Sequence, residues 1–164
     1  MFDKFGEMSS YKEINTLAEN LFNEGDIKSL KEMAKENGIP EDFVELYLSG
    51  DITELCDVET AAYGKIDVEV KELKLKGIME DWVEYLRVQI SDNDLLAHQV
   101  RKKGKSLKGC IAALLKWSFK NQVPVDKEIL KAAEVTAGKV TLGIPNMGKA
   151  KEIIRNYYLG GKKE

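Results

Sequence analysis

The sequence has few of the residues on which most catalytic and metal sites depend. Its 164 residues include one histidine, two cysteines and three prolines. His98 has no serine or cysteine nucleophile motif to serve, and the carboxylates do not follow the spacing of a metal-binding loop. We therefore expect no enzyme activity, no catalytic residue, no metal and no cofactor. Cys56 and Cys110 share no ligand spacing and are expected to be buried free thiols.

Long hydrophobic runs are also missing. No stretch approaches the roughly 20 apolar residues that span a bilayer, and no apolar run follows the first four residues, so we expect neither a membrane anchor nor a signal peptide. Together with the unpaired cysteines, this predicts a cytoplasmic protein. Hydrophobic residues still make up 43% of the chain, which is enough for a core that needs no disulfide or metal.

Helical periodicity fills most of the chain and predicts a mainly α fold, a multi-helix bundle with at most a short two-stranded β element. A capping box at Ser10-x-x-Glu13 and glycines at 25, 38 and 50 mark helix ends. Alternating residues at about 66–70 and 140–144 predict two short strands that pair with each other. The helices are expected at about 10–24, 27–37, 40–49, 51–62, 78–90, 93–103, 106–122 and 126–135, and from 146 onward.

Charge is distributed unevenly along the chain. Residues 1–80 hold 19 acids against 9 bases, and residues 81–164 hold 9 acids against 16 bases. Such asymmetry points to charged partners. The alternative is that the helices of the two halves have solvated faces that differ in charge without binding anything. The asymmetry also suggests an acidic N-terminal helical subdomain at 1–64, an extended connector at 65–76 and a basic C-terminal helical subdomain at 77–164, which can pack as one domain.

The segment from Leu30 to Gly50 has the spacing of a helix-turn-helix, with Gly38 at the turn. Its second helix sits where a recognition helix would read DNA. That helix carries three acids and no base, which would be repelled by phosphates. Three interpretations remain open: a plain helical hairpin, a protein-binding acidic face and a DNA reader. The candidate acidic face consists of Glu41, Asp42 and Glu45.

A basic patch lies between Leu95 and Val125, where the sequence contains no acid. Ser106 and the N–H groups that begin its helix, next to Lys105, could cradle an anion. We expect this patch to contact nucleic acid or an acidic protein, unless it is only a solvated face; it lacks the P-loop spacing for nucleotide hydrolysis. Trp117 and Tyr158 are the aromatic residues expected to be free for stacking, and Phe119 is placed in the core. The patch comprises Arg101, Lys102, Lys103, Lys105, Lys108, Lys116 and Lys120.

Several segments spread over nearly the whole chain resemble one protein family. They are Met1-Phe2-Asp3-Lys4-Phe5-Gly6, Leu75-Lys-Gly77-Ile78 with Asp81-Trp82, Val100-Arg-Lys-Lys-Gly-Lys-Ser-Leu-Lys-Gly-Cys110, Leu142-Gly-Ile-Pro145 and Ala150-x-x-Ile-Ile154-x-x-Tyr-Tyr158. The block from Val100 to Cys110 is the most specific of them. These segments are similar to the PcfK-like proteins of conjugative and other mobile elements, a family that includes type II-A anti-CRISPR inhibitors of Cas9.

The resemblance implies a non-catalytic inhibitor that binds Cas9, or the complex of Cas9 with guide RNA, and blocks DNA interference. The alternative is a nucleic-acid-binding accessory protein of conjugative transfer or plasmid maintenance. Cas9 holds its guide–target duplex in a positively charged channel, so the acidic face is the expected contact with the protein. The basic patch is the expected contact with nucleic acid. The apolar helices could also support a homodimer.

Overall fold

We analysed a computed structural model that describes residues 3–160. Within this range the chain is mainly helical, with nine helices and one short two-stranded antiparallel sheet, as predicted. None of the described helices is long and apolar enough to cross a membrane. The elements in chain order are α1 (Tyr11–Asn23), α2 (Ile27–Glu36), α3 (Glu41–Ser49), α4 (Val58–Leu73), α5 (Ile78–Ser91), α6 (Asp94–Arg101), α7 (Leu107–Lys120), β1 (Val123–Pro124), α8 (Lys127–Ala132), β2 (Thr141–Leu142) and α9 (Met147–Leu159).

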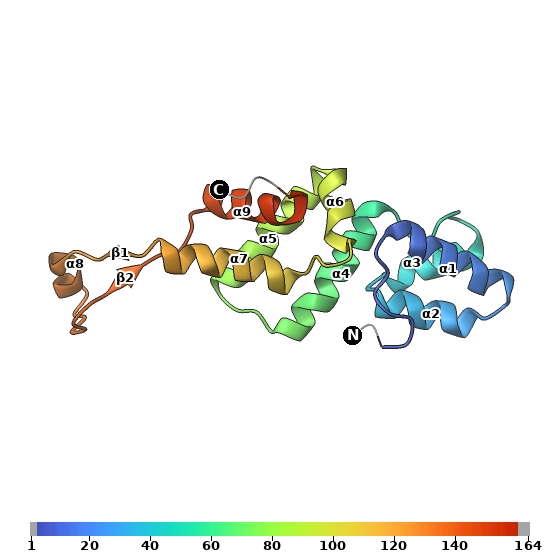
Figure 1. Cartoon of the computed structure of the whole chain (residues 1–164). Helices are drawn as coiled ribbons and strands as arrows, with labels where there is room; N and C mark the ends of the chain where they lie inside the picture. Colours follow the sequence, from blue (N-terminus) through green and yellow to red (C-terminus); the bar gives the residue numbers. More distant parts are fainter. Residues whose placement is uncertain (1–2, 161–164) are drawn as a thin grey trace.

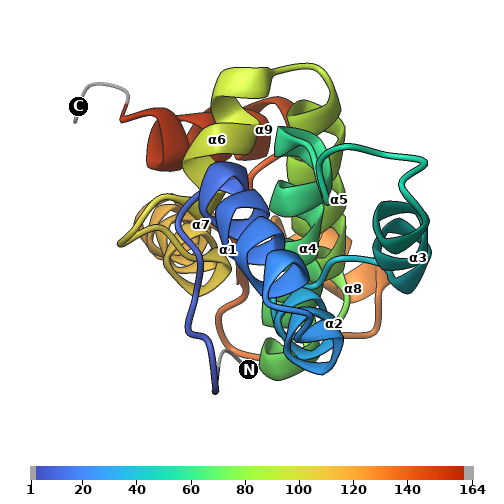
Figure 2. The same ribbon diagram turned by 90° about the vertical axis from the view of Figure 1, so that its right-hand side faces the viewer.

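The molecule is elongated, with three parts arranged along its length (Figure 1). The N-terminal lobe (residues 3–57) lies at one end and contains α1, α2 and α3. The C-terminal lobe (residues 58–120 and 147–160) forms the middle and contains α4 to α7 together with α9. A narrow arm (residues 121–146) carries β1, α8 and β2 and projects from the far end. Figure 2, which looks along the molecule from the N-terminal lobe, shows α1 and α2 in front of α4, with α3 set to one side.

Local signals in the sequence fix the helix ends of the N-terminal lobe. The Ser10 side chain caps α1 by accepting from the Glu13 amide at 3.2 Å, and Asp26 caps α2 by accepting from the Ser29 amide at 3.0 Å. Gly38 makes the turn before α3 in a left-handed conformation with φ 74°, which side chains with a Cβ adopt only at a cost. The three helices then enclose a core of their own, centred on the buried Ile14, Leu30, Met33 and Val44.

Helix α4 joins the two lobes, and here the prediction of an extended connector at 65–76 is wrong. Residues 65–73 continue the helix, so the predicted strand at 66–70 is helical as well. The expected helix at 51–62 begins only at Val58, after the Asp57 cap. The cause of the error is packing on two sides: Ala61 belongs to the N-terminal core, whereas Ala62 and Ile66 belong to the C-terminal core. A helix buried on more than one face loses the simple period of a surface helix.

The predicted strand at 140–144 has a different partner from the expected one. Only Thr141–Leu142 is extended, and it pairs with Val123–Pro124 rather than with 66–70. The register places Val123 opposite Leu142 and Pro124 opposite Thr141. The sheet is therefore a local ribbon within the arm. It does not connect the two lobes.

Candidate functional site

The predicted acidic face lies on the outside of the N-terminal lobe. Glu41, Asp42 and Glu45 are all exposed, and they occupy the first turns of α3. Carboxylates near a helix N-terminus are stabilised by the helix dipole, so these positions suit acids for structural as well as functional reasons. α3 contains no basic residue, and it is therefore unsuited to lie against phosphates.

The surroundings divide this face into two parts. Glu41 lines a hollow of about 490 Å³ together with Lys31, Lys35, Lys71 and Asp67, so its neighbourhood is mixed in charge. Asp42 and Glu45 do not line this hollow. Asp42 and Glu45 take part in none of the ion pairs within residues 3–160, so they are the part of this face that remains available to a partner.

A second feature of the N-terminal lobe is a groove between α1 and α3. It has a volume of about 850 Å³, and its lining contains two acids, Glu19 and Glu54, and one base, Lys12. The Phe22 and Tyr47 rings meet edge-to-face along it, with centroids 5.7 Å apart. The Phe22 ring is exposed, although it follows the buried Leu21 on α1. The groove offers an aromatic surface beside α3 with two acids and one base at its borders, and its rings suit a cationic side chain.

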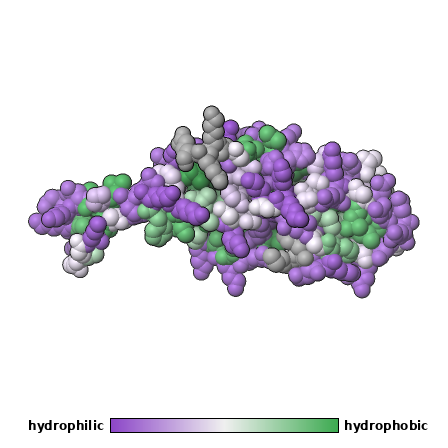
Figure 3. Space-filling view, in the orientation of Figure 1, coloured by the Kyte–Doolittle hydropathy of each residue, from purple (hydrophilic) through white to green (hydrophobic). Residues whose placement is uncertain are grey.

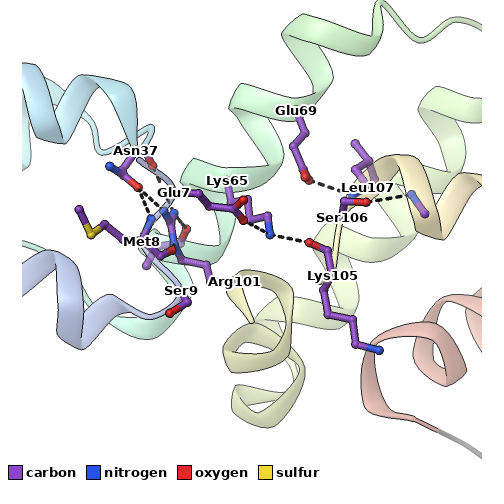
Figure 4. A network of polar contacts seen from close by, with 12 residues as sticks. Glu7, Met8, Ser9, Asn37, Lys65, Glu69, Arg101, Lys105, Ser106 and Leu107 are labelled. Carbon is purple, nitrogen blue, oxygen red and sulfur yellow. Dashed lines mark hydrogen bonds and ion pairs between the residues drawn. The ribbon is translucent and has the colours of Figure 1, made fainter. Parts of the chain in front are cut away.

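Arg101 is not part of any surface patch, contrary to the prediction. Its side chain is buried between the lobes, with a relative exposure of 1%. The guanidinium donates to the main-chain oxygens of Met8 at 2.9 Å and Ala61 at 2.7 Å, and to the Asn37 side-chain oxygen at 2.5 Å (Figure 4). Burial lowers the pKa of Arg101 to about 10, so it stays charged at neutral pH. A guanidinium has five N–H donors and can satisfy several carbonyls at once.

Lys105 also has a structural role. Its ammonium donates to the Tyr157 main-chain oxygen at 2.5 Å, and its own carbonyl accepts from the buried Lys65 ammonium at 2.7 Å. Lys65 forms an ion pair with Glu7 as well (Figure 4). Arg101 therefore links α6 to the N-terminal segment, the end of α2 and α4. Lys105 links the loop before α7 to α4 and α9. They are not available to a partner in the way the prediction required.

The proposed anion cradle at the start of α7 is already occupied by the protein itself. The Ser106 side chain accepts from the Gly109 amide at 3.1 Å, and the Leu107 amide donates to the Glu69 carboxylate at 3.0 Å. The Ser106 amide donates to the Tyr157 hydroxyl at 3.0 Å. Burial raises the pKa of the Glu69 carboxyl. An external anion would have to displace Glu69 to bind here, so this part of the prediction is wrong.

What remains of the patch is a row of exposed lysines that we call the basic ridge: Lys102, Lys103, Lys108, Lys116 and Lys120. The ion pairs of residues 3–160 involve Lys4, Lys65, Arg87 and Lys149, and none of them uses a ridge lysine. The positive charge of the ridge is therefore free of neutralising carboxylates in the described part of the chain.

Exposed apolar residues accompany the end of the ridge on α7. Leu115 is half-exposed and Phe119 has 74% of its surface exposed. The prediction that Phe119 belongs to the core and the prediction that Tyr158 is free for stacking are both wrong, because Phe119 is exposed and Tyr158 is buried. The sequence of α7 is apolar almost all round, so its hydrophobic pattern did not indicate which end of the helix extends beyond the core.

Groups with chemical reactivity do not gather in the described structure. Within residues 3–160, no three side chains among histidine, cysteine, aspartate and glutamate converge as a metal site. The His98 ring contacts the Tyr11 ring, with centroids 5.4 Å apart. Cys56 and Cys110 are buried free thiols, and burial raises the pKa of each to about 12. A thiol with so high a pKa is a poor nucleophile at neutral pH.

The geometry therefore offers two separated charged surfaces for binding: the acidic N-terminal lobe and the basic ridge. Comparisons of the chain with family models, with curated proteins and with solved structures found no match.

Proposed function

We propose that the protein is a non-catalytic inhibitor that binds Cas9 with its acidic N-terminal lobe and blocks CRISPR DNA interference. The observation that carries the proposal is the separation of charge along the molecule. Residues 3–57 contain 14 carboxylates and five lysines, whereas the basic ridge presents five exposed lysines within residues 101–120, which contain no acid. The sequence resemblance to PcfK-like proteins supports the same function.

The physical basis is charge complementarity. Cas9 binds nucleic acid in a positively charged channel, and an acidic surface of matching extent competes for such a channel. Opposite charges accelerate encounter and fix orientation. This contact is best made by Asp42 and Glu45 on α3, together with the groove between α1 and α3. The interaction should weaken as salt is raised, because exposed charges are screened over about 10 Å at 0.1 M.

The direct test is cleavage of plasmid DNA by several Cas9 orthologues in the presence of excess protein. We expect inhibition of at least one orthologue, and at least a tenfold loss of potency for Asp42→Lys with Glu45→Lys. The matched control is Glu72→Lys with Asp92→Lys, which makes the same charge change at exposed positions of the C-terminal lobe. The control should inhibit as the wild type does. Undiminished cleavage by every orthologue would refute the proposal.

A second candidate function is favoured by the basic ridge: a nucleic-acid-binding accessory protein of conjugative transfer or plasmid maintenance. If its five lysines meet phosphates, the logarithm of the binding constant should fall against the logarithm of salt concentration with a slope of roughly −4. Mobility-shift titrations at two salt concentrations would measure it. Lys116→Glu with Lys120→Glu should abolish the shift, whereas Lys74→Glu with Lys76→Glu, at exposed positions away from the ridge, should preserve it.

A further inference from the structure

The arm is a part of the molecule that buries almost nothing. From residue 119 to residue 144 every side chain is exposed or partly exposed. A two-stranded ribbon alone is at best marginally stable in water, and ordering each residue costs conformational entropy that burial must offset. The arm therefore lacks the core that a segment of its length requires.

The base of the arm is nevertheless fixed firmly to the end of α7. The Gln122 side chain donates to the Ser118 carbonyl at 2.6 Å and accepts from the Thr141 hydroxyl at 2.7 Å. Gly143 packs so closely that a Cβ there would lie 2.3 Å from the Ser118 oxygen. These contacts set the direction in which the arm leaves the body, so it is held in position before any partner covers it.

Exposed apolar side chains occur at several points along the arm, and the space-filling view shows some of them as green atoms among hydrophilic ones at its left end (Figure 3). Val123 and Leu142 are opposite each other in the ribbon, so their side chains share one face. They are 64% and 61% exposed. We call the whole set the apolar strip: Phe119 and Ile144 at the base, Val123 and Leu142 in the middle, and Ile129 and Val135 at the tip.

We propose that the apolar strip is the dimerisation surface of this protein and that a second copy of the chain covers it. Residues 121–146 contain three acids and three lysines, so the arm is neutral, whereas the N-terminal lobe and the ridge carry strong charge of one sign. Two identical lobes or ridges would repel each other on contact. The neutral arm can meet its own copy without that repulsion.

The distribution of the strip suits a two-fold arrangement of the arms. In an isologous interface the same patch is used on both subunits. Antiparallel arms would place the tip residues Ile129 and Val135 of one chain on the base residues of the other, with the two Leu142 side chains near the axis. This inference does not depend on the proposed function.

Light scattering coupled to size exclusion tests the proposal on the full chain. At about 100 µM, above the micromolar dissociation constants of weak interfaces of this size, we expect twice the 18.5 kDa chain mass. The double variant Val123→Glu with Leu142→Lys should give the monomer mass. The two substitutions remove the apolar pair and replace it with an oppositely charged cross-strand pair that keeps the ribbon together. The control Val88→Lys with Leu95→Glu, equally exposed on α5 and α6, should remain dimeric.

Crosslinking provides a second readout that does not depend on the stability of a variant. Leu142→Cys, near the expected axis, should form a disulfide-linked dimer under oxidising conditions, and Leu95→Cys should not. A wild-type protein that stays at the monomer mass would overturn the proposal. So would a dimer that survives the Val123 and Leu142 substitutions, since another surface would then hold the copies together. Binding of the arm only to a different protein would likewise give monomers here and refute it.

Discussion

Arg101 and Asn37 lie 64 positions apart in the sequence and are joined inside the interface between the lobes. The guanidinium donates to the Asn37 side-chain oxygen at 2.5 Å and to its main-chain oxygen at 3.3 Å. Asn37 itself is fully buried at the end of α2. The residue that looked most like part of a basic surface is thus the principal polar link between the two lobes.

Replacement of Arg101 by methionine should destabilise the protein by about 3 kcal/mol. It removes the Arg101 donor from three main-chain carbonyls and from the Asn37 side-chain oxygen, which keeps only the Met8 amide at 3.2 Å. Buried acceptors that lose hydrogen bonds are costly. Urea unfolding monitored by circular dichroism measures the change. The control Lys102→Met, at the exposed neighbouring position, should alter stability by less than about 0.5 kcal/mol. Equal stability of the two variants would contradict the structural role of Arg101.

Gly64 is expected to tolerate no side chain. It lies on α4 where that helix crosses the turn after α2, and a Cβ would be 2.6 Å from the Asn37 oxygen. Gly64→Ala should therefore cost about 3 kcal/mol through overpacking of the backbone crossing. Gly148→Ala is the matched control, since its nearest atom is 3.6 Å away. That control should stabilise α9 by roughly 0.5–1 kcal/mol. A stabilised Gly64→Ala protein would show that the crossing is looser than described.

Both cysteines should resist modification in the folded protein. Burial raises the pKa of Cys56 and Cys110 to about 12, so little thiolate is present at pH 8. Reaction with Ellman's reagent should be at least about 1,000-fold slower in native buffer than in denaturant. Two thiols per chain should react once the protein is unfolded. Rapid native modification of either cysteine would indicate that its site opens readily.

Glu69 should make stability fall as pH rises. Burial raises its pKa in the folded protein above the ordinary value of 4.5, so the folded state binds more protons than the unfolded state in the pH range between the two pKa values. The contribution of Glu69 is therefore most favourable at low pH and declines as pH increases through the raised pKa. Glu69→Gln keeps an oxygen to accept from the Leu107 amide.

Urea unfolding of the Glu69→Gln variant and the wild type at pH 4.5 and pH 7.5 checks this prediction. The variant should gain stability relative to the wild type at the higher pH, and Glu45→Gln on the exposed face of α3 provides the matched control. A difference between variant and wild type that stays constant with pH would contradict the expected effect.

Helix ends could be predicted from the sequence because their signals are local. Ser10, Asp26, Ser106 and Asn146 all cap the helices that follow them, and each accepts a hydrogen bond from the amide three residues later. A cap depends only on a few neighbouring residues. The mainly α fold class follows from the same kind of information.

The functional surfaces could not be predicted from the sequence, because they depend on contacts between residues that are far apart in the chain. Arg101 stands beside Lys102 and Lys103 in the sequence, and only the position of the N-terminal lobe decides that it is buried while they are exposed. Glu69 is far from Ser106 in the sequence, yet its carboxylate accepts a hydrogen bond from the Leu107 amide at the start of α7. Phe119 looked like core because it ends an apolar run. The absence of acids from 96 to 124 agrees with the exposed ridge lysines, which form no ion pair within residues 3–160.

The boundary between the two cores passes between consecutive residues, Ala61 and Ala62, of one continuous helix. One residue inserted between them would turn everything beyond by about 100°, and the two halves would face each other with mismatched surfaces. Changes in chain length during evolution should therefore accumulate in the arm and in the loop before α4 but be excluded from α4 itself. We therefore expect the two lobes to be inherited together, because a lobe from another protein would rarely continue α4 in the same register.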